Sequence, residues 1–446
     1  MPPDRATPGD MQLRSAAGRD SALHPVAQRT RSFLVGLRSA PLSLHEFVVM
    51  MAASMTLYAL AIDAILPALP IIGRGFGVQD ATELQYIVTL FVMGGGFGQM
   101  LYGPLADRLG RRPVLLLGLT LYVAVALLAA CATTIEMLLA LRLLEGLIAA
   151  AVSVIPLSIV RDRYAGAEMA RVMSLTIIVF LMVPALAPAL GQALLLTMSW
   201  RGIFVVLGVA ACLVGVWIGL RLPETLHPNH RRSLHPALLM AAGWQVLSDR
   251  TSIYYTLGTA VLLGSLMAYV SSLPQIFAVT FQLPALMPVI FALCAGTIVA
   301  ASFFNARIVE RVGMRRVSHA ALIGYTLFAA MHTLVALAGY DSPPVFCLMQ
   351  AATLGCFGLA ASNFNAIAMF HMGNIAGSAA SVQGLISMVG AALVASLIGH
   401  QWNGQVTFLP AGTVLCGVSA LTFVLLAERG KLFYDPEEPP CLKWST

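Results

Sequence analysis

Charged residues are scarce in this sequence, and their scarcity excludes an ordinary soluble protein. Asp, Glu, Lys and Arg make up 10% of the 446 residues, whereas soluble domains carry about 25%. Hydrophobic residues make up 59% of the chain. A chain with this composition is expected to lie in a lipid bilayer.

Motifs of enzymes and of ATP-driven pumps are also missing. The seven cysteines are widely spaced and form no C-x-x-C pair, so the sequence offers no pattern for a metal site or a disulfide framework. The stretch "HEFVV" (45–49) lacks the second histidine of a zinc protease, and neither a G-x-S-x-G nor a Walker sequence occurs. We therefore expect no enzyme, no metal and no cofactor.

Long apolar runs dominate what is present. Each of twelve runs is long enough, as a helix, to cross a hydrocarbon core of about 30 Å. The runs span approximately 47–72, 83–103, 113–132, 135–160, 170–194, 202–220, 252–275, 287–306, 316–338, 344–369, 376–398 and 408–427. The sequence predicts an all-α membrane protein with twelve transmembrane helices.

Basic residues indicate which loops face the cytoplasm, because Arg and Lys remain preferentially in short cytoplasmic loops. Twelve spans place both termini on one side. Of 26 Lys and Arg residues, all but Arg74, Arg142 and Arg201 fall on that side. The tail 1–45 has no apolar run and is read as a cytoplasmic segment, not a secretory signal. The strong excess of Arg over Lys indicates a GC-rich genome, so we expect a bacterial cytoplasmic (inner) membrane with both termini cytoplasmic.

The chain is internally duplicated. A shift of 203 residues lays "ADRLGRRPV" (106–114) over "VERVGMRRV" (309–317). Each copy joins the second and third helix of a half, which predicts two six-helix bundles. The expected units are a cytoplasmic tail 1–45, an N-terminal bundle 46–221, a cytoplasmic linker 222–250, a C-terminal bundle 251–428 and a cytoplasmic tail 429–446. Within the linker, about 236–247 is expected to form an amphipathic helix at the membrane surface.

The loop "GPLADRLGRRP" (103–113) carries a family signature, G-x-L-a-D-r-x-G-r-[kr]. The sequence resembles the major facilitator superfamily over about residues 45–430, and within it the twelve-span drug:proton antiporter group that contains the Bcr/CflA-type exporters. The signature is matched by Gly103, Leu105, Ala106, Asp107, Arg108, Gly110, Arg111 and Arg112. Further agreement comes from "DAILPALP" (63–70), "RLLEG" (142–146), "RDRY" (161–164), "SWRGIF" (199–204) and "LPETL" (222–226).

The resemblance implies the major facilitator fold and a role for this loop in conformational change. We expect Asp107, Arg108 and Arg112 to form a latch that holds the two halves together on the cytoplasmic side when the pocket faces outward and parts when it faces inward. Gly110 would supply a tight turn, and Gly103 a close helix approach. The alternative is a solvated turn whose arginines only set the topology.

Two acidic residues, Asp63 and Glu145, lie well inside predicted spans. A carboxylate at mid-membrane costs about 2.5–3.5 kcal/mol, so it usually faces a cavity, a partner or a functional path. Helix geometry places Asp63 and Arg142 at a similar depth. The resemblance implies function for the first-helix acid and the fourth-helix arginine, whereas the family usually has glutamine at Glu145. Asp63 is the first candidate for the proton carrier and Glu145 the second; the third reading gives both acids a purely structural role.

Glycine and proline mark two further helices. "VPALAPALGQALL" (183–195) is similar to the antiporter signature G-P-x-x-G-G with two glycines replaced; Pro188 and Gly191 would keep its kink and its close approach. The run "GGGFG" (94–98) lies in an apolar helix and indicates close helix packing, not a nucleotide site.

Polar and aromatic residues in the other spans are candidates for the substrate pocket. Each has an alternative role as an interhelical hydrogen-bonding group or interface anchor. They are Tyr58, Tyr269, Asn305, Asn363, Asn365 and Gln383.

The sequence thus predicts a secondary active transporter that works by alternating access. It would export small amphipathic molecules or drugs from the cytoplasm in exchange for protons, with the proton gradient as its energy source. The alternative is a dedicated metabolite exporter of the same fold, for a sugar, nucleoside, amino-acid derivative or siderophore-like compound. The expected partners are the small-molecule substrate, protons and the lipid bilayer, with no nucleic acid, and the expected state is a monomer.

Overall fold

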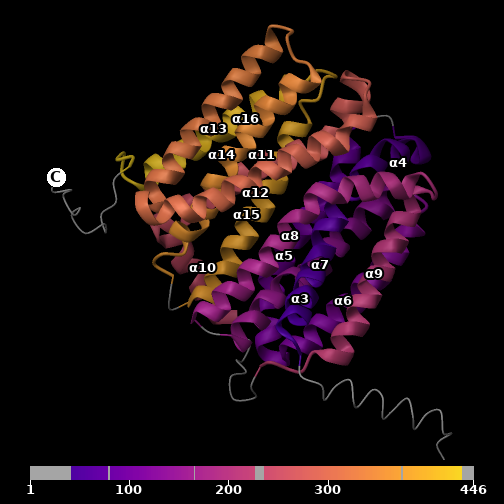
Figure 1. Ribbon diagram of the computed structural model, residues 1–446, viewed down its shortest axis with the longest axis vertical. Helices are drawn as coiled ribbons and strands as arrows, with labels where there is room; N and C mark the ends of the chain where they lie inside the picture. Colours follow the sequence, from indigo (N-terminus) through magenta and orange to yellow (C-terminus); the bar gives the residue numbers. More distant parts are fainter. Residues whose placement is uncertain (1–41, 79–80, 165, 227–235, 373–374, 434–446) are drawn as a thin grey trace, which may run out of the picture.

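The computed structural model describes residues 42–78, 81–164, 166–226, 236–372 and 375–433, and this part of the chain is helical without a strand (Figure 1). Its first half contains α3 (Leu44–Asp63), a 3-10 turn (Leu66–Ala68), α4 (Leu69–Phe76), α5 (Ala81–Leu109), α6 (Arg111–Ala130), α7 (Ile135–Arg163), α8 (Gly166–Leu195) and α9 (Trp200–Arg221). Its second half contains α10 (Pro236–Ser248), α11 (Arg250–Gln275), a π-helical turn (Ile276–Thr280), a 3-10 turn (Pro284–Leu286), α12 (Met287–Val312), α13 (Met314–Leu337), α14 (Pro343–Ala368), α15 (Ala376–Gly399) and α16 (Phe408–Ala427).

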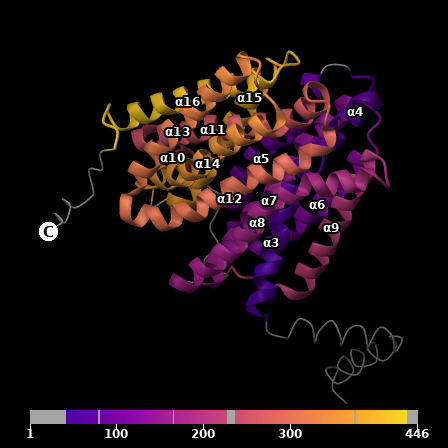
Figure 2. The same ribbon diagram turned by 45° about the horizontal axis from the view of Figure 1, so that its top comes forward.

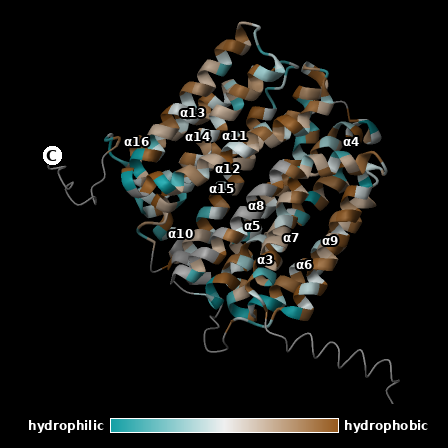
Figure 3. Ribbon diagram, in the orientation of Figure 1, coloured by the Kyte–Doolittle hydropathy of each residue, from teal (hydrophilic) through white to brown (hydrophobic). Residues whose placement is uncertain are grey.

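The long helices have the length and composition of membrane spans. Within the described residues, eleven segments are long and apolar enough to cross a bilayer. The 30-residue helix α8, whose stretch Leu186–Leu195 is apolar, is a further long helix between the fourth and fifth of these segments. Figure 3 shows hydrophobic residues along the helices and hydrophilic residues gathered near their ends. The predicted integral membrane protein is confirmed.

The helices form two bundles that lie side by side in both ribbon views (Figures 1 and 2). In the N-terminal bundle, α5 packs on α7 and α6 packs on α7 and α9, with α3 against α7 and α8. In the C-terminal bundle, α11 packs on α14, α15 and α16, and α13 on α14 and α16. Two pairs join the bundles: α5 packs along α15, and α8 packs against α12.

The duplication seen in the sequence recurs in the backbone. Gly110, before α6, has φ 106° and ψ 150°, and Gly313, before α13, has φ 89° and ψ 146°. A positive φ of this kind is readily adopted only by glycine. Each of these glycines therefore allows a sharp turn from the second to the third helix of its bundle.

A glutamate directly after the last helix of each bundle binds the start of that bundle's third helix. After α9, the Glu224 carboxylate accepts a hydrogen bond of 3.0 Å from the backbone N–H of Arg111, the first residue of α6. After α16, Glu428 pairs with Arg315, the second residue of α13, at 2.8 Å. An anion at a helix N-terminus is favourable because the helix dipole is positive there.

The glycines of the "GGGFG" run allow three neighbouring helices to pack closely on α5. A Cβ atom at Gly94 or Gly98 would overlap the backbone of α7, one at Gly95 would overlap the hydroxyl of Tyr58 on α3, and one at Gly96 would crowd Met388 on α15. The predicted close helix packing at this run is confirmed.

Helix α10 confirms the helix expected in the linker. Its Val246 is buried against Ala379 of α15 and neighbouring apolar residues. On α10, Met240 and Trp244 are each 75% exposed and Leu247 is 55% exposed. This exposed apolar face follows helical spacing, as in a helix that lies in a membrane interface.

Candidate functional site

The segment "DAILPALP" breaks the first span next to its acidic residue. Helix α3 ends at Asp63, and the two prolines stand in the first positions of the short helices that follow, Pro67 in the 3-10 turn and Pro70 in α4. Proline suits these positions because its missing N–H would have no partner in a first helical turn. Asp63 is buried at this break, with 5% of its surface exposed.

Arg142 of α7 is fully buried and fixed from four sides. Its Nε donates to the carbonyl of Ile87 at 2.9 Å, its Nη2 to the carbonyl of Ala61 at 2.8 Å, and its Nη1 to Glu145 Oε2 at 2.8 Å. The guanidinium carbon lies 4.3 Å from the ring centre of Phe91, a cation–π distance. These contacts hold Arg142 in one position.

Glu145 is the counter-charge of Arg142. The two residues are three apart on α7 and therefore share a face of the helix, and both side chains have no exposed surface. Glu145 Oε1 has no hydrogen-bond partner among the described residues. Because an unpaired buried charge is costly, the glutamate keeps the cation neutralised within its own helix.

Asp63 lies near this pair without joining it. Arg142 binds the carbonyl of Ala61, two residues before Asp63, so the arginine and the acid are at one level of the bundle, as helix geometry predicts. Within the part of the chain that the structure describes, however, the Asp63 carboxyl group forms no hydrogen bond or ion pair. The structure therefore contains two buried carboxyl groups near each other: that of Asp63 has no partner in the described residues, and that of Glu145 is paired with Arg142.

Helix α8 packs directly on the break that follows Asp63. Pro188 and Gly191 are both buried, and a Cβ atom at Gly191 would overlap the backbone carbonyl of Ala64. Gly191 thus permits the close approach that the resemblance implied. Movement of α8 would displace the turn that carries Asp63.

A cavity of about 200 Å³ lies on the other side of this turn, between the bundles. Pro67 and Gln192 line it from the N-terminal bundle, and Pro274 and Pro284 from the C-terminal bundle. Ligand pockets for drug-sized molecules usually have about 300–1,000 Å³. This cavity would therefore have to enlarge to hold such a molecule.

The signature loop forms ion pairs inside one bundle. Asp107 pairs with Arg111 at 2.5 Å, and Arg111 Nε donates to Asp162 Oδ2 of α7 at 2.9 Å. Arg112 Nη2 donates to the carbonyl of Gly219 on α9 at 2.6 Å. In the described residues, these side chains tie α5, α6, α7 and α9 together within the N-terminal bundle. The latch between the halves that we expect when the pocket faces outward stays a prediction.

Two other members of the signature behave differently. Arg108 is exposed, whereas Gly103 faces the side chain of Ser381 on α15. Gly103 is thus the signature residue that meets the other bundle. It does so by close packing and not by charge.

Hydrogen bonds between the bundles lie at the opposite end of α5. Gln85 Nε2 donates to Gln275 Oε1 at 2.9 Å and to Ser272 Oγ at 3.4 Å, both on α11. The Tyr86 hydroxyl lies 2.9 Å from Nε2 of His400, the residue directly after α15. The sequence analysis missed Gln85 and Gln275, since neither belongs to a quoted motif.

Three of the four amide candidates for substrate binding in the C-terminal bundle are occupied by protein partners. Asn363 Nδ2 donates to Asn305 Oδ1 at 2.8 Å, and Asn305 Nδ2 lies 3.4 Å from Asn363 Oδ1. Gln383 Nε2 donates to Ser252 Oγ at 2.8 Å and to the carbonyl of Ala368 at 3.0 Å. These contacts match the interhelical role that the sequence left open.

The remaining three candidates differ in environment. Tyr58 is buried against Phe91, with ring centres 5.2 Å apart, and therefore borders the Arg142 site. Tyr269 is buried and stacks on Phe291. The hydroxyl groups of both tyrosines lack a partner among the described residues, whereas Asn365 is exposed.

A second buried pair of titratable groups was not foreseen. His332 Nε2 of α13 lies 3.3 Å from Asp341 Oδ2, and the side chains are 1% and 7% exposed. The sequence placed Asp341 in a loop, where a carboxylate is normally solvated. The loop folds back against α13, and this tertiary contact has no local sequence signal.

Comparison with known proteins places this architecture in a family. The family model described as Major Facilitator Superfamily matches residues 51–395. The chain is 29% identical over 363 residues to the MFS-type transporter YdgK of Bacillus subtilis, covering 80% of this chain and 88% of that protein. It is 26% identical over 353 residues to a bicyclomycin resistance protein homolog of Haemophilus influenzae, with coverages of 79% and 88%. It is 28% identical over 362 residues to the chloramphenicol resistance protein CraA of Acinetobacter baumannii, with coverages of 78% and 84%.

Solved structures share the fold. The xylose transporter XylE from E. coli, in a partially occluded inward open conformation, aligns with a TM-score of 0.68 and 11% identity over 86% of this chain and 97% of its own. A peptide transporter POT in complex with sulfate aligns with a TM-score of 0.69 and 14% identity over 86% and 94%. Together with the family match, which covers most of the sequence, the helical fold shows that this chain belongs to the Major Facilitator Superfamily and is a membrane transport protein, not an enzyme.

Proposed function

We propose that this transporter exports small amphipathic molecules or drugs from the cytoplasm in exchange for protons, by alternating access. Relatives named for resistance to bicyclomycin and chloramphenicol support drug-like substrates. The proton gradient is the energy source, and no cofactor takes part. The protein works in a bacterial cytoplasmic membrane with both termini in the cytoplasm, which the distribution of Arg and Lys supports.

The observation that carries the proposal is the isolation of the Asp63 carboxyl group. It is buried at the break of the first span and has no protein partner within the described residues. A proton that binds there neutralises a carboxylate that no ion pair compensates within the described residues. Glu145 is less suited to this task, since its charge balances Arg142.

The packing around Asp63 supports coupling between its proton and a movement of helices. The turn after Asp63 touches Gly191 of α8, and α8 packs on α12 of the other bundle. A change of charge at Asp63 alters the solvation that this turn requires. The turn then shifts against α8, which transmits the shift to the interface between the bundles.

Purified protein reconstituted in vesicles with an imposed pH gradient tests the proposal. We expect chloramphenicol or bicyclomycin to move against its gradient as protons move the other way, and expect the exchange to stop in Asp63→Asn. Drug movement that is unaffected by the pH gradient would overturn the proton coupling. A deletion strain with unchanged drug susceptibility and an altered metabolite profile in its medium would instead favour the dedicated metabolite exporter.

A further inference from the structure

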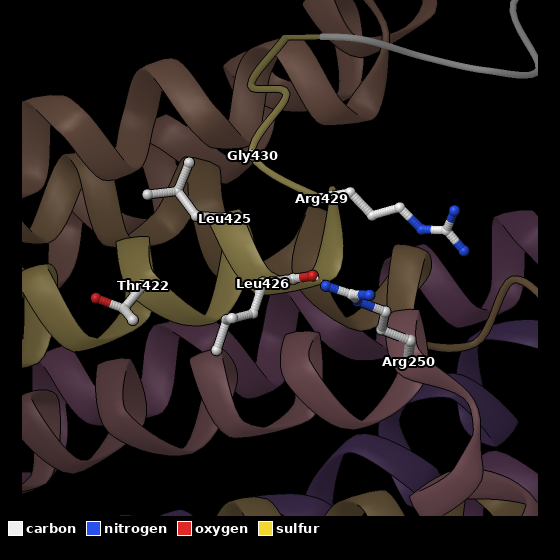
Figure 4. Close-up of a pocket in the computed structure, with 6 residues that line it drawn as sticks. All are labelled: Arg250, Thr422, Leu425, Leu426, Arg429 and Gly430. Atoms are coloured by element: carbon white, nitrogen blue, oxygen red, sulfur yellow. Dashed lines mark hydrogen bonds between the residues drawn. The ribbon is translucent and has the colours of Figure 1, made fainter.

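A groove lies between the first turn of α11 and the last turn of α16, outside the site described above. Its volume is about 630 Å³. The residues that line it are Arg250, Thr422, Leu425, Leu426, Arg429 and Gly430 (Figure 4). Figure 4 shows both guanidinium groups at one end of the groove and the side chains of Thr422 and Leu425 towards the other.

The two arginines of the groove are available to an anion. Arg250 Nε donates to the carbonyl of Leu426 at 2.6 Å, which fixes the side chain and leaves its two terminal nitrogens without a partner in the described residues. Arg429 is exposed and, within the same part of the chain, makes no hydrogen bond or ion pair. Two guanidinium groups with unpaired nitrogens therefore lie at one end of the groove.

The carboxylates next to these arginines are already engaged. Asp249 accepts a hydrogen bond from the backbone N–H of Ser252 at 2.7 Å and lies 3.1 Å from His371. Glu428 binds Arg315 at 2.8 Å and the Tyr255 hydroxyl at 2.8 Å. Neither acid forms an ion pair with Arg250 or Arg429 in the described residues, so both guanidinium groups remain available to a ligand.

Below the arginines, α16 presents an apolar stripe to the surroundings. Leu415 is 69% exposed, Val418 50% and Leu426 40%. Thr422 continues the same series, and spacings of three or four residues place these four side chains on one face of α16. Arg429 lies two residues beyond the end of this helix. Because α16 is a membrane span, this stripe runs from the hydrocarbon core to the boundary where the arginines lie.

We propose that the groove binds the headgroup of an anionic phospholipid, whose acyl chain lies along the exposed stripe of α16. The arginines supply charge-assisted hydrogen bonds to phosphate oxygens, and the stripe supplies apolar contact. Free phosphate would use the arginines alone and leave the stripe without a function. A lipid uses both features and is present at the membrane boundary at high concentration.

Lipid binding to the full chain is the test. Protein in detergent is titrated with phosphatidylglycerol or phosphatidylcholine, and binding is followed by native mass spectrometry and by the thermal midpoint of unfolding. Attraction of two basic residues to an anionic headgroup predicts at least about tenfold tighter binding of phosphatidylglycerol. Arg250→Gln with Arg429→Gln should abolish this preference and leave phosphatidylcholine binding unchanged.

Arg307→Gln with Arg311→Gln is the matched control, because it removes two positive charges from the last turns of α12, at the same end of the C-terminal bundle. This control variant should keep the preference for phosphatidylglycerol. Loss of the preference in the control would show a general effect of charge and would refute the proposed lipid site. Retained preference in the Arg250 and Arg429 variant would overturn it as well, provided that circular dichroism shows native helix content.

Two further experiments test which molecule or segment occupies the groove. Millimolar inorganic phosphate should compete poorly with phosphatidylglycerol, and full competition would assign the groove to a free anion. Removal of residues 434–446, which include Asp435, Glu437 and Glu438, should leave lipid affinity unchanged. A gain of about tenfold or more would assign the groove to those acidic residues instead.

Discussion

Gln85 of α5 and Gln275 of α11 join the two bundles through a side-chain hydrogen bond of 2.9 Å. The contact lies at the end of α5 that is remote from the signature loop, and Tyr86 contacts His400 beside it. Loop ion pairs at the other end of α5 stay inside the N-terminal bundle. The bundles are therefore held at the Gln85 end, and opening of this end requires the hydrogen bond to break.

A short cross-link that a reductant can cleave, in place of this contact, should arrest transport. We expect Gln85→Cys/Gln275→Cys protein joined by a bis-methanethiosulfonate reagent to bind drug and fail to exchange it, with turnover restored by a reductant. Exchange rates before and after reduction, in vesicles, measure the effect. Each single cysteine variant is the control and should keep exchange after the same treatment; exchange that continues in the cross-linked protein would show that this end need not open.

Asp63→Asn should abolish proton-driven exchange and leave the protein folded in the membrane. The amide keeps the shape of the side chain and loses the titratable proton. Proton uptake and drug movement under an imposed pH gradient are the measurements. Glu145→Gln is the comparison and should retain exchange; complete loss in that variant alone would place the proton site on α7.

Replacement of Glu145 should lower the free energy of unfolding more than it impairs the coupling of drug exchange to protons. Glu145→Leu leaves Arg142 as an uncompensated buried cation, which costs about 3–5 kcal/mol. Glu145→Gln should cost less, because the amide oxygen still accepts from Arg142 Nη1. Denaturation in detergent checks the order, and Arg142→Met added to Glu145→Leu should recover much of the loss. A double variant less stable than Glu145→Leu alone would contradict this account.

Gly146→Ala should destabilise the N-terminal bundle by at least about 1–3 kcal/mol, since overpacking forces the helices apart. A Cβ atom at Gly146 would overlap the backbone carbonyl of Phe91. Gly355→Ala on α14 is the matched control, because no atom lies within 4 Å of the added Cβ; it should be neutral or slightly stabilising. Equal unfolding midpoints for the two variants would refute the close approach of α5 and α7.

Asp107→Asn should slow the transport cycle more than it weakens substrate binding. The change removes the ion pair to Arg111 and loosens the contacts that tie the loop to α7, far from the Arg142 site. Equilibrium binding in detergent, set beside turnover in vesicles, separates the two effects. Unchanged turnover with a large fall in affinity would exclude a role in conformational change.

The fold could be predicted because membrane insertion is governed by local composition. Apolar runs mark the spans, and the repeated loop around Gly110 and Gly313 marks the duplication. Asp63, Arg142 and Glu145 were found for the same reason, since ionisable residues inside a span are rare.

Contacts between distant residues could not be predicted in this way. Phe91 beneath Arg142 looks like any apolar residue of a span, and Gln85 meets Gln275 across 190 positions of sequence. The burial of Asp341 against His332 likewise depends on how a loop folds back. The motif likewise marks Asp107 as a residue of interest without revealing its contact with Arg111.

The glutamates that follow the last helix of each bundle, Glu224 and Glu428, have a mechanical consequence. Each glutamate connects the end of the last helix of its bundle to the start of the third helix. Force applied to one of these helices is therefore shared by its neighbours. Bending inside a bundle is therefore resisted, which leaves the contacts of α5 with α15 and of α8 with α12 as the places where the two bundles can shift. A compound that wedges into either seam would stall the transporter without touching its substrate site.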